Sequence, residues 1–252
     1  MAMLIAFLGT GASGGTPVVG CKCRACEEAR SIWLARRRPT SILVLTGGKQ
    51  AILLDAGFDV TRYVDSLELK AILITHWHHD HIAGLFRLRW ARALRLPVYG
   101  PNVVEPEIAG NPLSLDVRSV EAFEEFDLAG LKVTPLRLRH SVETLGYLLE
   151  EGGKRAAFLF DTKGLPNETL DFLRSRAIDL AVIDANFPPG HERDDHNNVD
   201  QAIEIGDELG AKAVVLTHID HCNLPFSELV RYVVKKSPRV SVAYDGMVFH
   251  MP

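Results

Sequence analysis

The chain has 252 residues, of which 47% are hydrophobic and 24% are charged, and its formal net charge is −4. This length allows one large domain, and the composition is ordinary for a globular protein with a substantial core. The slight negative charge gives no electrostatic reason to expect a nucleic acid or an anionic membrane as partner.

The N-terminal residues 1–9 form a short apolar run that has no basic residues before it and leads into glycines. This pattern predicts a buried strand rather than a signal peptide. No stretch approaches the roughly 18 apolar residues of a membrane span. We therefore expect a cytoplasmic protein without a membrane or nucleic-acid partner.

Three of the four cysteines, Cys21, Cys23 and Cys26, lie within six residues. Without a secretion signal, this crowding favours a metal clip over a disulfide framework. Three thiolates at this spacing can surround one tetrahedral zinc ion, but a fourth ligand is needed. His221 is the first candidate and Cys222 the alternative. A closed site of four ligands leaves no position for substrate, so the predicted role is structural.

Short apolar runs recur along the chain and predict mostly buried strands. These runs are Leu4–Leu8, Ile42–Leu45, Ala51–Leu54, Ala71–Ile74, Leu131–Thr134, Tyr147–Leu149, Ala156–Phe160, Leu180–Ile183, Ala213–Leu216 and Val240–Ala243. Helical spacing predicts helices over Ile82–Arg95, over Glu168–Arg176, from a capping box at Asn198 to Gly210, and over Pro225–Lys236. No linker or repeat divides the chain, so we expect a single α/β domain over residues 1–252, with helices outside stacked sheets.

The segment 76–81 has the sequence HWHHDH and holds four of the ten histidines. In an extended segment His76 and His78 point the same way. Asp80 and His81 follow where the chain turns into a helix, so they can serve a different ion. Imidazole and carboxylate ligands suit Zn, Mn, Fe or Ni. The segment therefore predicts a metal site, while the identity of the metal stays open.

Three further candidate ligands, His140, Asp161 and His218, each follow a predicted strand. Strand ends on a common edge of a sheet are places where scattered residues converge on a site. A single histidine after a strand is more often structural. Together with the first segment, however, these three residues complete the shell that two metal ions would need.

A His-X-His-X-Asp-His segment followed by a separate His, Asp and His resembles the metallo-β-lactamase superfamily. The resemblance implies a four-layer αββα fold with two mixed sheets and flanking helices. It also implies the ligand sets: His76, His78 and His140 for one metal, Asp80, His81 and His218 for the other, and Asp161 as a bridge. Asp55 in Leu54-Asp55-Ala56-Gly57 resembles a residue that supports the site by hydrogen bonds, although it could be a plain turn residue.

The cysteine clip narrows the resemblance to phosphodiesterases of the PhnP family. Other matching motifs include Gly9-Thr10-Gly11, Phe86-X-Leu88-Arg89-Trp90, Pro97-Val98-Tyr99-Gly100-Pro101, Asp161-Thr162-X-Gly164-Leu165-Pro166 and Tyr244-Asp245-Gly246-Met247. The resemblance implies hydrolysis of 5-phosphoribosyl 1,2-cyclic phosphate to ribose 1,5-bisphosphate in phosphonate catabolism, by the carbon–phosphorus lyase pathway. It implies two divalent metals (Mn or Zn), one structural zinc, a small cyclic sugar phosphate as substrate, and a homodimer.

The catalytic side chains expected from this resemblance are His196 and the metal ligand Asp80. His196 matches a histidine that reaches the substrate or leaving group, and a histidine is a credible general acid near neutral pH. The alternative is a solvated loop residue. Lys163, Arg87 and Arg89 are available to hold a terminal phosphate, and the sequence does not choose between them. His79 and His250 have no predicted role.

Three other functional interpretations compete with a phosphodiesterase. A tRNA 3′-processing nuclease would share the His motif, but we find no protruding tRNA-binding arm and no basic surface pattern. A non-hydrolytic relative such as PqqB has a similar cysteine clip, but its metal motif is typically altered. A metal-binding protein that has lost catalysis is the third alternative, and the complete ligand set counts against it.

Overall fold

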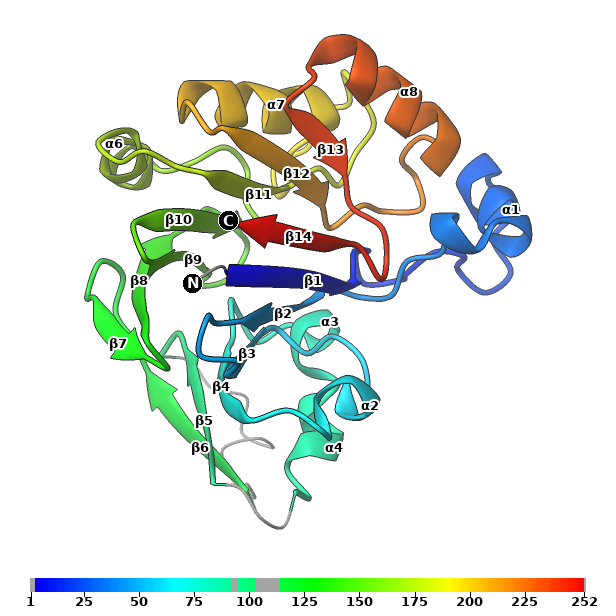
Figure 1. The fold of residues 1–252 in the computed structure, drawn as a ribbon. Helices are drawn as coiled ribbons and strands as arrows, with labels where there is room; N and C mark the ends of the chain where they lie inside the picture. The colour runs from blue at the N-terminus through cyan, green and yellow to red at the C-terminus, as the bar shows by residue number, and fades with distance from the viewer. Residues whose placement is uncertain (1–2, 92–94, 103–113, 252) are drawn as a thin grey trace.

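The computed structural model describes residues 3–91, 95–102 and 114–251 (Figure 1). Two seven-stranded sheets stack against each other. In spatial order, the first sheet consists of β14 (Val248–Met251), β1 (Met3–Gly9), β2 (Ser41–Leu45), β3 (Ala51–Leu54), β4 (Leu69–Leu73), β5 (Leu96–Gly100) and β6 (Leu115–Ser119). The second consists of β13 (Val240–Val242), β12 (Ala213–Thr217), β11 (Leu180–Asp184), β10 (Lys154–Leu159), β9 (Leu145–Glu151), β8 (Leu131–Arg137) and β7 (Phe126–Leu128).

Helices cover the outer face of each sheet, which completes the four layers that the sequence predicts (Figure 1). On the first sheet lie α2 (Thr61–Val64), α3 (His79–Ile82) and α4 (Leu85–Leu88). On the second lie α6 (Asn167–Arg174), α7 (Val199–Glu208) and α8 (Phe226–Lys236). Both sheets are mixed, because β3 to β6 and β10 to β13 pair in parallel while the other neighbours are antiparallel. The prediction of an α/β fold is therefore confirmed.

Three apolar clusters separate the four layers. The cluster between the sheets includes fully buried Phe7 and Ile52 from the first sheet and Tyr147 and Phe158 from the second. The other two clusters lie between each sheet and its helices. Burying one such large side chain contributes roughly 1.5–3 kcal/mol. The core therefore holds the two sheets rigidly face to face, and the ends of their strands meet at one edge.

Each predicted strand falls on an observed one, with ends that differ by up to three residues, the largest difference being at the end of β8. The prediction of one continuous helix over Ile82–Arg95 is wrong, because α3 and α4 are separate, and residues 92–94 lie outside the described residues. The break is at Gly84, where the chain passes the backbone of Phe58 so closely that a Cβ atom would lie 2.0 Å from its carbonyl oxygen. Only glycine fits such an approach, so helical spacing alone could not locate the break.

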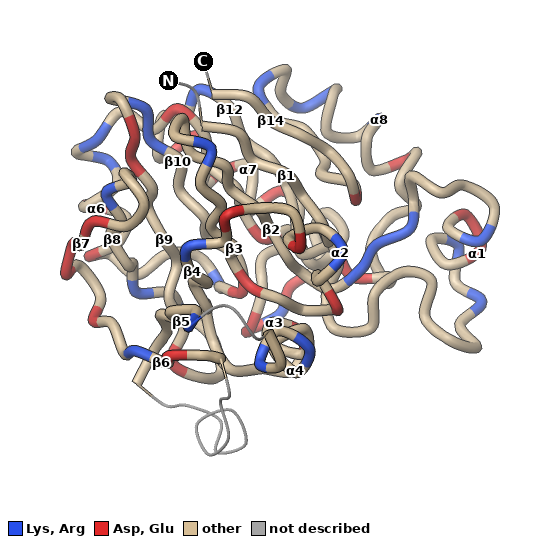
Figure 2. Tube along the Cα trace, turned by 60° about the horizontal axis from the view of Figure 1, so that its bottom comes forward, with Lys and Arg blue, Asp and Glu red and all other residues tan. Residues whose placement is uncertain are grey.

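A further helix, α1 (Arg24–Ser31), extends beside the sheets and begins within the cysteine segment (Figure 1). Cys23 is its N-cap, and the Cys23 side chain accepts a hydrogen bond from the Cys26 amide. Basic and acidic residues are both scattered over the part of the fold seen in Figure 2. Among the described helices, none has the length and apolar character needed to cross a membrane.

Candidate metal centre

The predicted ligands lie at the ends of strands from both sheets. The segment 76–81 follows β4, His140 follows β8, Asp161 follows β10 and His218 follows β12. Asp161 and His218 have left-handed backbone conformations, with φ of 60° and 52°. Residues other than glycine rarely adopt this backbone conformation unless the surrounding structure fixes it, and residues held in this way cluster at functional sites. The fold therefore turns the chain sharply at both residues and directs them into the site.

Three of the predicted ligands, His76, His78 and His140, form one group whose ligand atoms lie within 4.8 Å of one another. His76 Nε2 lies 2.9 Å from His78 Nδ1. His140 Nδ1 lies 3.3 Å from the backbone carbonyl oxygen of Asp195. Because a carbonyl oxygen can only accept, the imidazole N–H donates this hydrogen bond. Burial lowers the pKa of both His76 and His78. Neutral imidazoles with a free lone pair are the form that binds a metal ion.

Asp80, His81 and His218 form a second group within the same distance. The two oxygens of Asp161 lie beside it: Oδ2 is 3.2 Å from His81 Nε2, and Oδ1 is 3.1 Å from His218 Nε2. His76, His81 and Asp161 also form a group, so Asp161 lies between the two predicted ligand sets. The structure thus brings all seven predicted active-site ligands together.

The electrostatics of this cluster fit a shared cation. Burial alone would lower the pKa of His81, but the carboxylates of Asp161 and Asp55 outweigh burial and raise it well above its ordinary value. Burial alone would raise the pKa of Asp161, but His218 and His81 hold it well below. His81 Nε2 and Asp161 Oδ2 are close and buried, yet among the described residues neither has a hydrogen-bond partner. Buried polar atoms normally have one, so these two atoms suit coordination to a metal ion.

Asp55 supports the cluster as the sequence predicts. Its Oδ2 contacts His81 Nδ1 at 2.7 Å, and it accepts hydrogen bonds from the amide and hydroxyl of Thr75. A carboxylate on the far nitrogen of a ligating histidine fixes the ring and raises its basicity. Gly57 closes the same turn, because a Cβ atom there would lie 2.0 Å from the carbonyl oxygen of Asp80.

His196 also reaches the cluster, with its ring centroid 5.0 Å from that of His140 and 5.3 Å from that of His218. Its Nδ1 lies 2.7 Å from Asp184 Oδ2. Burial lowers the pKa of His196, but the hydrogen bond and charge of Asp184 outweigh it and raise the pKa to about 9. Sequence reasoning missed Asp184, although its position at the end of β11 was a signal of the kind that identified Asp161.

The cysteine clip forms a separate cluster of Cys21, Cys23, Cys26 and His221. His221 Nδ1 lies 3.5 Å from Cys21 Sγ and 3.6 Å from Cys23 Sγ. Tetrahedral zinc with usual Zn–S and Zn–N lengths places sulfur and nitrogen ligands about 3.6 Å apart. The described geometry therefore suits zinc, with His221 as the fourth residue, while Cys222 is exposed and outside the group.

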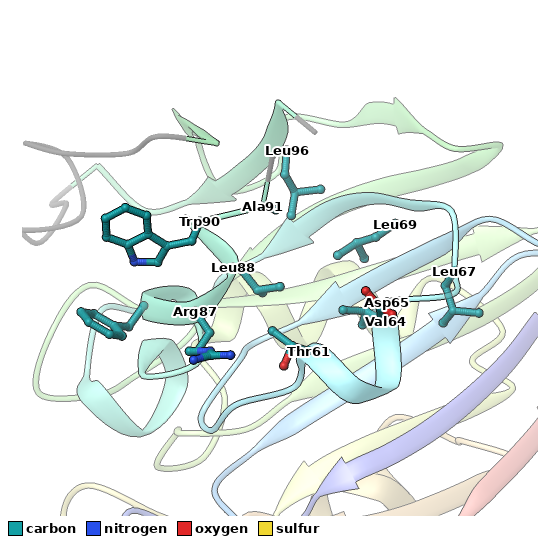
Figure 3. Close-up of a pocket in the computed structure, with 11 residues that line it drawn as sticks. Thr61, Val64, Asp65, Leu67, Leu69, Arg87, Leu88, Trp90, Ala91 and Leu96 are labelled. Carbon is teal, nitrogen blue, oxygen red and sulfur yellow. The ribbon is translucent and has the colours of Figure 1, made fainter. Parts of the chain in front are cut away.

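A hollow of about 550 Å³ opens beside the cluster and is lined by Ser13, Pro39, Gly57, His78, His79, Asp80 and Ala83. None of the three cations considered for a terminal phosphate lines this hollow. Lys163 pairs with Glu192 and Arg89 stacks on Phe86. Arg87 lines a different hollow of about 460 Å³ between α2 and α4, which contains none of the predicted ligands (Figure 3).

Comparisons with known proteins find relatives with different described roles. An octanoyltransferase of Porphyromonas gingivalis is 32% identical over 96% of this chain, and the chain spans 50% of that protein's length. A coenzyme PQQ synthesis protein B of Methylobacterium radiotolerans is 30% identical, with 73% of this chain and 71% of that protein covered. A solved structure described as a new diphosphatase from the PhnP family superposes with a TM-score of 0.85 and 27% identity, covering 100% of this chain and 98% of that one.

The sequence profile of the β-lactamase superfamily domain matches residues 50–219, which are more than half of the chain. This range includes every predicted ligand of the cluster around Asp161. The matched domain and the neighbour described as a diphosphatase favour a metal-dependent hydrolase. The chain belongs to the metallo-β-lactamase superfamily.

Proposed function

We propose that this protein is a dinuclear metal-dependent phosphoric diester hydrolase that converts 5-phosphoribosyl 1,2-cyclic phosphate to ribose 1,5-bisphosphate. The observation that carries the proposal is the position of Asp161, whose two oxygens face His81 and His218 between the two ligand groups. A carboxylate in this position could be shared by two ions. The similarity to a protein described as a PhnP-family diphosphatase supports phosphate chemistry.

His76, His78 and His140 would hold one ion, Asp80, His81 and His218 the other, and Asp161 would bridge them. Bound divalent ions such as Mn or Zn activate water near neutral pH and neutralise charge on phosphate oxygens. The protein's own contribution is to fix the ligands. Asp55 orients His81, and the buried backbone turns hold Asp161 and His218 in place.

In the proposed reaction, water adds to phosphorus and the bond from phosphorus to the sugar O2 breaks, which leaves the phosphate on O1. The departing oxygen needs a proton. His196 can supply it, because the contact between its Nδ1 and Asp184 leaves Nε2 for the substrate and keeps the ring protonated at neutral pH. Asp80 belongs to the second ligand group and also lines the hollow, so it would hold an ion beside the space that is open to substrate.

The proposal includes the remaining expectations from the sequence. The substrate is a small cyclic sugar phosphate, the cysteine clip holds one structural zinc, and the protein acts as a homodimer in the cytoplasm without a nucleic-acid or membrane partner. A second candidate is a PqqB-like non-hydrolytic role. It is supported by the 30% identity to a coenzyme PQQ synthesis protein B.

The test is to determine the bound metals and to assay 5-phosphoribosyl 1,2-cyclic phosphate, bis-p-nitrophenyl phosphate and a tRNA precursor. His76→Ala removes a predicted ligand, and His250→Ala on β14 is the matched control. We expect metal-dependent opening of the cyclic sugar phosphate that His76→Ala loses and His250→Ala keeps. Activity on the generic diester alone would retain the hydrolase and reject the substrate. No activity on any of the three by the metal-loaded protein would favour the PqqB-like role.

A further inference from the structure

Thr40 precedes β2 and contacts the cluster from a fully buried position. Its Oγ1 lies 2.8 Å from His218 Nδ1 and 3.1 Å from the carbonyl oxygen of Gly11. Within the described residues, Thr40 is the only hydrogen-bond partner of that imidazole nitrogen. Neither the sequence patterns nor the roles discussed above assign a function to this residue.

The two contacts of Thr40 determine which nitrogen of His218 carries the proton. A threonine hydroxyl has one hydrogen to donate and lone pairs to accept with, and a carbonyl oxygen can only accept. The hydroxyl hydrogen therefore goes to the carbonyl oxygen of Gly11. The remaining contact must be donated by His218 Nδ1–H, because two lone pairs would otherwise face each other at 2.8 Å.

A proton on Nδ1 leaves a lone pair on Nε2 of the neutral ring. This nitrogen lies 3.1 Å from Asp161 Oδ1, and it belongs to the group formed with Asp80 and His81. A lone pair that faces a carboxylate at this distance is stabilised when both coordinate the same cation. Thr40 thus does for His218 what Asp55 does for His81, with a neutral hydroxyl in place of a carboxylate.

The surroundings keep Thr40 at a fixed distance from the ring. Its backbone carbonyl accepts hydrogen bonds from the Gly57 amide and the Ser41 hydroxyl. On the other side, the Ile219 amide donates to the carbonyl of Thr10, one residue before Gly11. The hydroxyl therefore links the N-terminal loop, the start of β2 and the left-handed turn at His218.

We propose that Thr40 is a positioning residue of the metal centre, whose hydroxyl holds His218 in the Nδ1-protonated tautomer so that Nε2 binds the ion shared with Asp80 and His81. The inference rests on the proposed use of this cluster as a metal site. It does not depend on the substrate, because its test measures metal binding.

The experiment compares Thr40→Val, which keeps the shape and removes the hydroxyl, with Thr40→Ser, which keeps the hydroxyl. Thr134→Val is the matched control, because Thr134 is also buried and its hydroxyl has no hydrogen-bond partner in the described part of the chain. Metal affinity is measured for Zn²⁺ by competition with a chromogenic chelator, and metal content by elemental analysis. Loss of a partner of this kind weakens metal binding about 10- to 100-fold.

We expect Thr40→Val to weaken the binding of one of the two cluster ions by that factor and to leave the binding of zinc at the cysteine clip unchanged. Thr40→Ser should restore most of the affinity, and Thr134→Val should bind as the original protein does. Unchanged affinity in Thr40→Val, an equal loss in Thr40→Ser, or an equal loss in Thr134→Val would each overturn the proposal.

A second measurement needs no variant. Imidazole ¹⁵N spectra of the zinc-loaded original protein should show His218 with a proton on Nδ1 and the metal on Nε2. Metal on Nδ1 would overturn the proposal even if Thr40→Val failed to fold. A protein that binds both ions normally but hydrolyses none of the test esters would refute the proposed function and leave the role of Thr40 intact.

Discussion

Replacing Asp184 with asparagine tests whether His196 is the proton donor. Asp184 raises the pKa of His196 to about 9, which keeps the ring protonated at neutral pH. Without the carboxylate the pKa returns toward about 6.5, so the protonated fraction at pH 7.5 falls roughly tenfold, from about 97% to about 9%. At pH 6 the fall is less than about twofold, because both rings are then mostly protonated.

The assay compares two substrates across pH 6 to 9. A sugar oxygen needs a proton as it leaves, whereas p-nitrophenolate leaves readily without one. In Asp184→Asn we expect kcat for the cyclic sugar phosphate to fall about tenfold at pH 7.5, and to recover toward pH 6. The value for bis-p-nitrophenyl phosphate should change little. In His196→Ala, kcat should fall about 10²- to 10⁴-fold for the cyclic sugar phosphate only.

Asp194→Asn is the matched control, because Asp194 is an exposed carboxylate on the same loop. It should leave both activities unchanged. An equal loss on both substrates at every pH would refute the reasoning. It would show that Asp184 acts through the metal site or the fold, and not through a proton on His196.

Three further predictions follow from the geometry. Cys26→Ser should release the clip's zinc and lower the free energy of unfolding by roughly 3 kcal/mol, which corresponds to a fall in Tm of ~6–12 °C. Cys222→Ser should change neither the zinc content nor Tm. Gly57→Ala should reduce the content of cluster metal and lower Tm, because the new Cβ would lie 2.0 Å from the carbonyl oxygen of the ligand Asp80. Gly48→Ala should do neither, because its Cβ would lie 3.6 Å from the nearest atom. Metal-free protein should lose stability as pH rises above about 6.5, because the raised pKa of His81 stabilises the fold only while that ring is protonated. The gain in Tm on adding metal should therefore grow from pH 6 to 9, and a constant or shrinking gain would contradict this account.

Ten of the fourteen described strands, and the ligands, could be predicted because local patterns determine them. Apolar runs of β-branched residues predict buried strands, and polar residues directly after such runs, such as Asp161 and His218, predict a site. The break at Gly84 could not be predicted in this way. It depends on the approach of Phe58, whose backbone contacts the helical segment only in the folded chain.

The supporting residues were harder to find than the ligands. Thr40 and His218 are 178 positions apart. Nothing in Pro39-Thr40-Ser41 shows that this threonine, unlike any other near a strand, accepts a hydrogen bond from an imidazole. Asp184 ends β11 as Asp161 ends β10, but its partner His196 lies in a loop without periodic pattern. Pairings of this kind arise from tertiary contact, so a single sequence holds little signal for them.

The histidines of the cluster show how the partner of one ring nitrogen can set the role of the other. His218 has a neutral partner in Thr40, so it stays uncharged and suits a metal ligand. His196 has a carboxylate partner, which favours the protonated ring and suits a proton donor. His81 also has a carboxylate partner, Asp55, but its second nitrogen lies among further carboxylates, where a metal ion can replace the proton. The charge of the partner and the charge around the free nitrogen must therefore be considered together before a histidine near a metal site is assigned as ligand or acid.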